Sequence, residues 1–181
     1  MRIGAKIILS FSLLLLWVSA PVLAQEVSPT EYQLKAAFLF NFAKFVDWPP
    51  AAFTNSTAPF VIGVLGQDPF GKDLENTVRN KSIGGHAIVA RAVASIPDAR
   101  QCQILFVSNS ESKRLREILD GLRGASVLTV GENEKFFVAG GMVNFVVEGR
   151  KIRFQINDAA AKAAGLKISS KLLSLALPAP H

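Results

Sequence analysis

The feature that most constrains the fold is a pair of alternating segments on either side of Gly149 and Arg150. Residues 142–148 and 151–157 place apolar and polar side chains in turn, and the two-residue loop begins with glycine, which suits a type II′ hairpin turn. Pairing across this loop aligns three apolar pairs on one face, namely Val143 with Ile156, Phe145 with Phe154 and Val147 with Ile152, and sets Glu148 against Lys151. A one-residue slip would move every apolar partner off that face, so the register is well specified. The opposite face, with Asn144, Arg153 and Gln155, is expected to be partly solvated.

The chain before this hairpin alternates short apolar runs with turn and helix signals. Strands are predicted at residues 60–65, 87–94, 103–107 and 127–130. Helical patterns between such strands favour a parallel arrangement, whereas the hairpin is antiparallel. The sequence therefore predicts an α/β fold with a mixed, partly parallel sheet flanked by helices. No internal repeat or linker divides residues 25–181, so these are expected to form a single domain.

Capping patterns predict where the helices begin. Residues 28–31 (Ser-Pro-Thr-Glu) resemble a capping box, and the helix they open should run to about Asp47, before Trp48 and two prolines. Its broad apolar surface is expected to pack within its own domain. Asp68 and Pro69 predict a helix to about Arg79, and residues 108–111 predict another to about Leu122. A loop or short helix is expected after Gly131, a helix after Asn157, and a short strand or turn followed by a final helix within residues 167–177.

The first 24 residues have the pattern of an export signal. Arg2 and Lys6 precede an apolar run that extends from Ile7 to Val18, and small residues follow up to Ala24. The run is shorter than the roughly 20 residues that a membrane span needs. We therefore predict a signal peptide over residues 1–24, cleaved after Ala24. Because Arg2 and Lys6 leave with it, the net charge of +6 falls to +4 in the processed chain.

The composition leaves few side chains for catalysis or metal binding. Cys102 is the only cysteine, which excludes an internal disulfide and a cysteine-rich metal site, and it is interpreted as a half-buried apolar residue. The two histidines are His86, expected on a surface loop, and His181. No serine-hydrolase motif is present. The sequence therefore predicts no enzyme, no cofactor and no metal site, and the absence of a basic cluster argues against nucleic-acid binding.

Residues 66–72 match the GxxxxGK spacing of a phosphate-binding loop and lie between a predicted strand and helix. The next position holds Asp73, where magnesium coordination requires serine or threonine. Asp68 adds negative charge inside the loop, and Pro69 has no backbone N–H to offer a phosphate. The segment is therefore interpreted as a strand-to-helix turn.

Several segments together resemble the YfiR-like family. They occur in the family's order across nearly the whole processed chain, at residues 32–45 with the following Trp48-Pro49, 66–71, 140–145, 151–157 and 164–174. The last of these, AGLKISSKLLS, is quite specific. None contains active-site chemistry, so the resemblance indicates a family rather than a reaction.

The resemblance implies a periplasmic protein of a Gram-negative bacterium with an α/β sandwich fold, often a homodimer. Such regulators bind the periplasmic sensory domain of an inner-membrane diguanylate cyclase and repress it, which lowers cyclic di-GMP signalling and biofilm formation. An outer-membrane, peptidoglycan-associated lipoprotein can draw the regulator away under envelope stress. Members that respond to oxidation rely on cysteine pairs, so a chain with Cys102 alone cannot use that switch.

A regulator without catalytic residues must act by binding, and aromatic side chains are enriched at the centres of protein interfaces. Phe45, Trp48 and Phe53, at and beyond the exit of the first helix, are the candidate partner-binding residues. The alternative function is that of a periplasmic small-ligand receptor. Its ligand would occupy a crevice at the carboxyl ends of the strands that finish at Leu65 and Val107.

Overall fold

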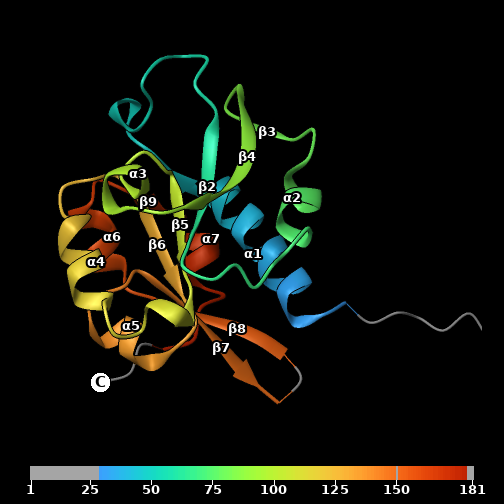
Figure 1. Ribbon diagram of the computed structural model, residues 1–181, viewed down its shortest axis with the longest axis vertical. Helices are drawn as coiled ribbons and strands as arrows, with labels where there is room; N and C mark the ends of the chain where they lie inside the picture. The colour runs from blue at the N-terminus through green and yellow to red at the C-terminus, as the bar shows by residue number, and fades with distance from the viewer. Residues whose placement is uncertain (1–28, 150, 179–181) are drawn as a thin grey trace, which may run out of the picture.

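A seven-stranded mixed sheet runs through the computed structural model, which describes residues 29–149 and 151–178 (Figure 1). In chain order its strands are β2 (Phe60–Leu65), β3 (Ser82–Ile83), β4 (His86–Val93), β5 (Ile104–Val107), β6 (Leu128–Gly131), β7 (Val143–Glu148) and β8 (Lys151–Ile156). In space they follow the order β3-β4-β2-β5-β6-β7-β8. The five central strands run parallel, and β3 and β8 are antiparallel at the two edges. The predicted mixed, partly parallel α/β fold is confirmed.

Helices cover both faces of the sheet. On one face lie α1 (Glu31–Phe45), α2 (Asp73–Val78) and α7 (Ser170–Leu173), and on the other lie α3 (Ile96–Ala99), α4 (Leu115–Gly121) and α5 (Glu134–Val138). The side chains of β2 alternate between these two layers, because successive residues of a strand point to opposite faces. Phe60, Ile62 and Val64 enter the core under α1, whereas Val61 and Leu65 enter the core under α4. Two cores therefore hold β2 from both sides.

The first long helix begins and ends at different residues from those predicted. Thr30 is its N-cap, since its hydroxyl accepts the Gln33 backbone N–H at 3.3 Å and the Gln33 side chain accepts the Thr30 N–H at 3.0 Å. This capping box replaces the predicted one, whose Ser28 lies outside the described residues. The helix stops at Phe45 rather than near Asp47, because Val46–Asp47 forms strand β1 and pairs with β9 (Lys167–Ile168).

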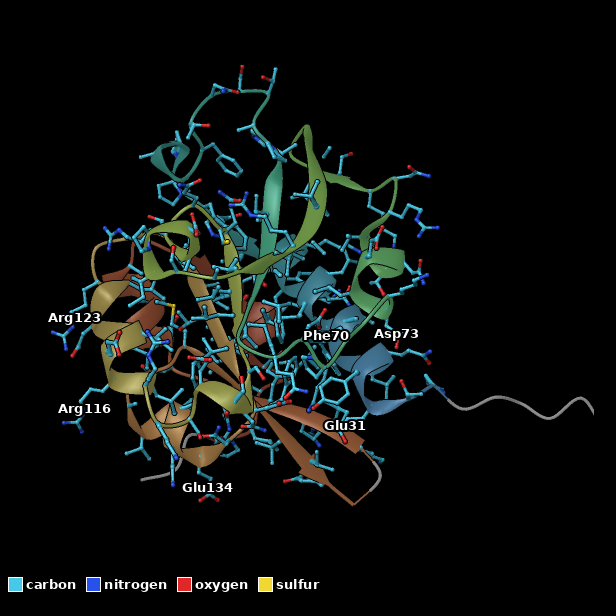
Figure 2. The ribbon with its side chains drawn as sticks, viewed as in Figure 1. Glu31, Phe70, Asp73, Arg116, Arg123 and Glu134 are labelled. Carbon is cyan, nitrogen blue, oxygen red and sulfur yellow. The ribbon has the colours of Figure 1, made fainter. Side chains whose placement is uncertain are left out.

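The helix predicted from Pro69 to Arg79 is shorter than expected, and α2 begins only at Asp73 (Figure 2). The Asp68 carboxylate accepts the N–H of Phe70 at 2.8 Å and so closes a local turn instead of capping a helix. Gly71 then has a φ of +54°, which no helical turn contains. The strand-to-helix turn predicted for residues 66–72 is present, and its loop is longer than expected.

The helix predicted between residues 108 and 122 is split into two. Asn109–Glu111 is a single 3-10 turn, η2, and α4 starts afresh at Leu115. The Ser108 hydroxyl accepts the N–H of Ser110, two residues on, at 3.4 Å. The predicted capping box needs the Ser108 hydroxyl to accept the N–H of the third residue after it, Glu111. Because the hydroxyl instead accepts the N–H of the second residue, the chain first forms a 3-10 turn rather than an α-helix.

The hairpin formed by β7 and β8 has the predicted register at every pair. Phe145 and Phe154 both pack on Phe42 of α1, with ring centroids 5.8 and 5.2 Å away. Asn144 is buried rather than solvated, because α5 packs on that part of β7. Val147 is 53% exposed because the hairpin tip extends beyond the helices (Figure 1). The predicted turn type depends on Arg150, which lies outside the described residues.

The C-terminal part follows its prediction. Asn157 caps α6 (Asp158–Ala163) by accepting the N–H of Ala160 at 3.0 Å, and Gly165 follows the helix with a φ of +75°. β9 and α7 then occupy residues 167–173. In the part of the chain that the structure describes, no helix has the length and apolarity to cross a bilayer. The predicted signal peptide and its cleavage after Ala24 lie outside that part.

Candidate functional site

The parallel strands have two ends, and each end contains one of the places predicted to bind another molecule. The loop of residues 50–59, which precedes β2, lies at the amino ends, at the top of Figure 1. The loops that follow β2, β5 and β6 lie at the carboxyl ends, in the lower half of the same view. The candidate aromatic residues belong to the first region and the predicted crevice to the second.

Trp48 is a half-buried residue that ties the chain to the sheet. Its indole Nε1 donates a hydrogen bond to the backbone carbonyl of Gln103 at 3.1 Å. Its ring meets the ring of Phe60 edge-on, with centroids 4.9 Å apart. Trp48 therefore joins the segment after α1 to the first residue of β2 and to the residue before β5, and exposes only part of its ring.

Phe53 is also half-buried, and it stacks flat on the imidazole of His86 at a centroid distance of 4.0 Å. The Nδ1 atom of His86 is hydrogen-bonded to the carbonyl of Ala58, 2.6 Å away. His86 was expected on a surface loop, but it is the first residue of β4, because the short strand β3 pairs back onto it at Ile83. His86 therefore contacts the loop of residues 50–59 at two places, the ring of Phe53 and the carbonyl of Ala58.

The three candidate aromatic residues do not form one cluster. Trp48 and Phe53 both pack on Phe60, at 4.9 and 6.3 Å between ring centroids. Phe45 belongs to α1 and packs beside α7, where the Nζ atom of Lys171 lies 5.6 Å from its ring. Two of the three predicted residues are therefore brought together, and Phe45 faces a different part of the molecule.

Gln103 holds this region together, and the sequence assigned it only to a strand. It is 3% exposed. Its side-chain Nε2 donates to the carbonyl of Ala52 at 2.6 Å, and its Oε1 accepts the N–H of Val61 at 2.7 Å. With the bond from Trp48 to its backbone, one residue fixes the loop, β2 and the indole. The available signal was an amide side chain at the entrance of an otherwise apolar strand.

A cavity of about 310 Å³ opens beside this loop. It is lined by Phe53, Thr54, Gln101 and Gln103 together with two arginines, Arg91 of β4 and Arg100 after α3. Sequence reasoning missed both arginines, because residues 53, 91 and 100 meet only through the strand order. We call Trp48, Phe53, Arg91, Arg100 and Gln103 the amino-end surface.

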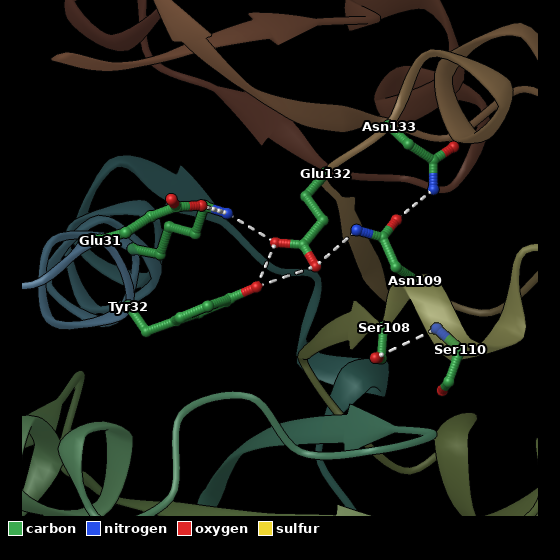
Figure 3. A network of polar contacts seen from close by, with 8 residues as sticks. Glu31, Tyr32, Ser108, Asn109, Ser110, Glu132 and Asn133 are labelled. Carbon is green, nitrogen blue, oxygen red and sulfur yellow. Dashed lines mark hydrogen bonds and ion pairs between the residues drawn. The ribbon is translucent and has the colours of Figure 1, made fainter. Parts of the chain in front are cut away.

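The carboxyl ends hold a buried ion pair between Lys35 of α1 and Glu132, the residue after β6 (Figure 3). The Lys35 Nζ and Glu132 Oε2 atoms are 2.6 Å apart, and the two side chains are only 3% and 4% exposed. Lys35 also contacts a carboxylate oxygen of Glu31 at 2.5 Å. Burial without partners would be costly for either charge, so this pairing explains why both side chains can lie inside.

Hydrogen bonds from neighbouring side chains complete the environment of Glu132. Asn109 Nδ2 donates to Oε1 at 3.0 Å, and the hydroxyl of Tyr32 donates to both carboxylate oxygens at 3.4 Å. Asn133 donates in turn to the side-chain oxygen of Asn109 at 2.5 Å. We call these residues, with Lys35 and Glu31, the carboxyl-end network.

The network shifts the protonation of two of its members. Burial lowers the pKa of the Lys35 ammonium, but hydrogen bonds to Glu132 and Glu31 raise it by more, so the pKa lies above its usual value. Burial, followed by the negative charge of Glu132, raises the pKa of Tyr32. Lys35 is therefore charged and Tyr32 neutral at physiological pH, and neither of the two is poised for proton transfer.

The crevice predicted beyond Leu65 and Val107 is bridged by the chain itself. The backbone N–H of Gln67, after β2, donates to the hydroxyl of Ser110, after β5, at 2.9 Å. A side chain at Gly66 would collide with that hydroxyl. Because both oxygens of Glu132 already accept hydrogen bonds, the carboxyl-end network is suited to holding α1 on the sheet rather than to binding a ligand.

The remaining candidate for reactivity is Cys102, which is 2% exposed and packs in the core under α4. Burial raises the pKa of its thiol, and the Arg91 guanidinium beside it opposes that effect. A neutral, buried thiol is a poor nucleophile. Within residues 29–149 and 151–178, no group of three or more histidine, cysteine or acidic side chains is placed to hold a metal ion.

The comparison with family models settles which proteins this chain is related to. The model described as YfiR/HmsC-like matches residues 32–177, which include both ends of the sheet. The chain belongs to the YfiR/HmsC-like family. YfiR-like proteins are periplasmic regulators rather than enzymes. A search of curated proteins finds no match.

Within this YfiR/HmsC-like fold, the two ends of the sheet differ in what they can do chemically. The carboxyl-end network consists of charges that satisfy one another inside the protein. The amino-end surface combines half-buried aromatic rings with exposed guanidinium groups beside a cavity. Aromatic and arginine side chains are the residues on which protein interfaces most depend. The amino-end surface is therefore the candidate functional site.

Proposed function

We propose that this protein represses an inner-membrane diguanylate cyclase by binding the periplasmic sensory domain of that enzyme. Repression would lower cyclic di-GMP and biofilm formation. The observation that carries the proposal is the match of the YfiR/HmsC-like family model to residues 32–177, because it covers nearly all of the described chain. The predicted signal peptide supports it, since export would place the protein beside the sensory domain.

Binding energy is the only means by which such a protein can control an enzyme across a membrane. A cyclase that exchanges between an active and an inactive state responds to a protein that binds the inactive state more tightly. Shifting the cyclase from about 99% active to about 99% inactive requires the protein to bind the inactive state about 10⁴-fold more tightly than the active state. The contact surface must therefore recognise one conformation of the sensory domain closely.

The amino-end surface is the proposed contact. Trp48 and Phe53 offer aromatic area, and Gln103 fixes both the Trp48 indole and the loop that carries Phe53. A loop that is already held in place loses little conformational freedom on binding, which favours affinity. We propose Phe45 only as a peripheral contact, because it packs beside α7.

Two further partners belong to the same proposal. An outer-membrane, peptidoglycan-associated lipoprotein would compete for the regulator and so release the cyclase. A homodimer would present two contact surfaces to its partner. The lipoprotein should appear in the material that co-purifies with the protein from cross-linked cell envelopes, and a homodimer should appear there as a cross-linked species with the mass of two chains.

Deleting the gene tests the proposal in the cell. Cyclic di-GMP and surface attachment should rise in the deletion strain and return to their original level when the gene is restored. Deleting the cyclase gene as well should abolish the rise, which is the matched control. A deletion that leaves cyclic di-GMP unchanged, in cells that express the cyclase, would contradict the repressor function.

Export is tested separately. Mass spectrometry of the protein released from the periplasm should find Gln25 at its N-terminus, because Val22 and Ala24 suit signal peptidase. A protein that keeps residues 7–18 and stays with the membrane fraction would show that the apolar run is an anchor.

A further inference from the structure

Arg91 and Arg100 are two of several cationic residues that form no ion pair among the described residues, and both of them line one cavity. The ion pairs of residues 29–149 and 151–178 engage Lys35, Arg114, Arg123, Arg153 and Lys162, and none includes Arg91 or Arg100. The two unpaired guanidinium groups nevertheless line one cavity. Two like charges facing a shared space repel each other unless a group of opposite charge lies between them.

The Arg100 side chain is held in position by neighbours that leave part of its guanidinium free. Arg100 Nη1 donates to the carbonyls of Gly121 at 2.7 Å and Arg123 at 3.2 Å. Arg91 lies opposite Gly63 in the sheet and beside the thiol of Cys102. Each guanidinium has five N–H donors, so donors remain for a ligand. The position of the Arg100 charge is therefore set before anything binds.

The rest of the cavity lining indicates which class of ligand fits. The lining contains no aspartate, glutamate or lysine, and its other polar groups belong to Thr54, Gln101 and Gln103. Asp98, on the neighbouring helix α3, accepts a hydrogen bond from Ser95 at 2.6 Å and does not line the cavity. The lining is therefore positively charged and contains hydrogen-bond donors, which suits an anion.

Another cavity, elsewhere on the described part of the chain, shows the opposite arrangement. It measures about 390 Å³ and is lined mainly by apolar and small residues of α4, α6 and β6. Its charged residues, Asp120 and Arg123, form an ion pair with each other at 2.8 Å. That cavity offers no uncompensated charge.

We infer that the cavity between Arg91 and Arg100 binds carboxylate groups on an acidic segment of the partner protein. The inference rests on the proposed function for the identity of that partner, and the recognition of carboxylates can be tested without it. Guanidinium groups bind carboxylates through paired hydrogen bonds, which give direction as well as attraction.

A protein segment fits this site better than a free anion. Both arginines are exposed, so a lone anion would gain little from them against water and salt. Phe53 lines the same cavity, and Trp48 lies just behind Gln103, which provides aromatic area that a small anion cannot use. Protein interfaces are enriched in arginine and aromatic residues and depleted in lysine and acidic residues, and this cavity has the same composition.

Trp48 makes the inference testable with the processed protein. The chain has two tryptophans, Trp17 in the predicted signal peptide and Trp48, so residues 25–181 contain a single tryptophan, which lies next to Gln103 of the cavity. We would titrate this protein with hexaglutamate and follow the Trp48 emission at about 0.15 M salt, where charges farther apart than about 8 Å are largely screened. Hexaglutamine and glutarate, a free dicarboxylate, serve as comparison ligands.

Hexaglutamate should produce a saturable change in emission, and hexaglutamine should not. Replacing both arginines (Arg91→Gln with Arg100→Gln) should weaken the binding by about tenfold or more, because hydrogen bonds to charged groups are lost. The matched control removes two exposed positive charges elsewhere, with Lys113→Gln and Arg116→Gln, the latter on the outer side of α4 (Figure 2). That variant should bind hexaglutamate within about twofold of the wild type, since distant surface charges are screened.

Three results would overturn the inference. The first is a wild type that does not respond to hexaglutamate. The second is an equal loss of binding in the two double variants, which would indicate only an effect of net charge. The third is glutarate binding as tight as that of the peptide, which would indicate a small-molecule site. The proposed function fails separately. If hexaglutamate binds as expected but gene deletion leaves cyclic di-GMP unchanged, the cavity serves another acidic partner; if deletion raises cyclic di-GMP but hexaglutamate does not bind, the cyclase contacts another surface.

Discussion

The two ends of the parallel strands treat charge in opposite ways. At the carboxyl ends, Lys35 and Glu132 are almost completely buried and bind each other. At the amino ends, Arg91 and Arg100 are exposed, line a cavity and have no acidic partner among the described residues. A charge that is buried and paired stabilises one arrangement of the chain. A charge that is held in place and left unpaired remains available for another molecule.

This difference associates the carboxyl ends of the strands with the stability of the fold and the amino ends with binding. Ligands of open α/β sheets usually bind at the carboxyl ends of the strands. Here that region is occupied by the carboxyl-end network and by the bridge between Gln67 and Ser110. The amino-end surface, where such folds rarely bind ligands, has the cavity and the free donors instead.

Removing Lys35 should have the largest effect on stability. Lys35→Met leaves the Glu132 carboxylate buried without its cation, and we expect the free energy of unfolding to fall by about 3–5 kcal/mol. Urea denaturation followed by circular dichroism measures this loss.

A double variant separates the ion pair from the packing around it. Lys35→Met combined with Glu132→Gln should be more stable than the sum of the two single losses predicts, by more than about 1 kcal/mol, because the uncompensated charge is gone. If the losses of unfolding free energy in the two single variants simply add up in the double variant, Lys35 and Glu132 do not act as a pair. The contrast between paired charges at the carboxyl ends and unpaired charges at the amino ends would then be wrong.

The hairpin beside this network provides the second test. Phe154 is 3% exposed and packs against Phe38 and Phe42 with ring centroids 5.5 and 5.2 Å away. Phe154→Ala should cost about 3–5 kcal/mol. Arg153 lies on the opposite face, where it forms a long surface ion pair of 4.0 Å with Glu148. Arg153→Ala should therefore change the free energy of unfolding by less than about 1 kcal/mol. Equal losses in the two variants would refute the register.

The pH dependence of stability should show the same network. The folded protein holds the protons of Lys35 and Tyr32 more tightly than the unfolded chain, since the pKa of each is raised. Their contribution is therefore complete below the unfolded values, about 10.4 for lysine and 10 for tyrosine, and is lost as the pH rises above them. Thermal melts from about pH 9 to pH 11.5 should show a steep fall in the wild type. Lys35→Met should show a shallower one, and parallel curves would contradict the assignment.

The smallest effect on stability is expected at the amino-end surface. The double variant Arg91→Gln with Arg100→Gln should unfold within about 1 kcal/mol of the wild type, because both side chains are exposed and make no ion pair. Its urea denaturation curve should nearly overlay that of the Lys113→Gln with Arg116→Gln control. A loss as large as that of Lys35→Met would mean that these arginines serve the fold.

Much of this fold follows from local patterns in the sequence. Strand β2 was predictable because a short continuous apolar run is typical of a buried strand, and the hairpin register because alternation and a two-residue turn specify it within a few residues. Helix limits were less predictable, since Val46 and Asp47 leave α1 to pair with a strand more than a hundred residues later. A short-range pattern contains no information about such a pairing.

The candidate site was predictable only in part. Aromatic composition pointed to Trp48 and Phe53, and the structure does bring these two together. Arg91 and Arg100 reach the same cavity through the order β4-β2-β5, which the sequence does not specify. Lys35 lies on a mostly apolar helix, and its burial depends on Glu132, which no helical periodicity could relate to it.

Cyclic di-GMP in living cells tests the central claim most directly. A strain that lacks the gene would be supplied with the wild type, with Arg91→Gln/Arg100→Gln, or with Lys113→Gln/Arg116→Gln, at equal periplasmic levels measured by immunoblot. The account predicts that the wild type and the Lys113/Arg116 variant return cyclic di-GMP to its low level, while the Arg91/Arg100 variant leaves it near that of the deletion strain. Full repression by the Arg91/Arg100 variant would contradict the claim that the amino-end surface binds the cyclase.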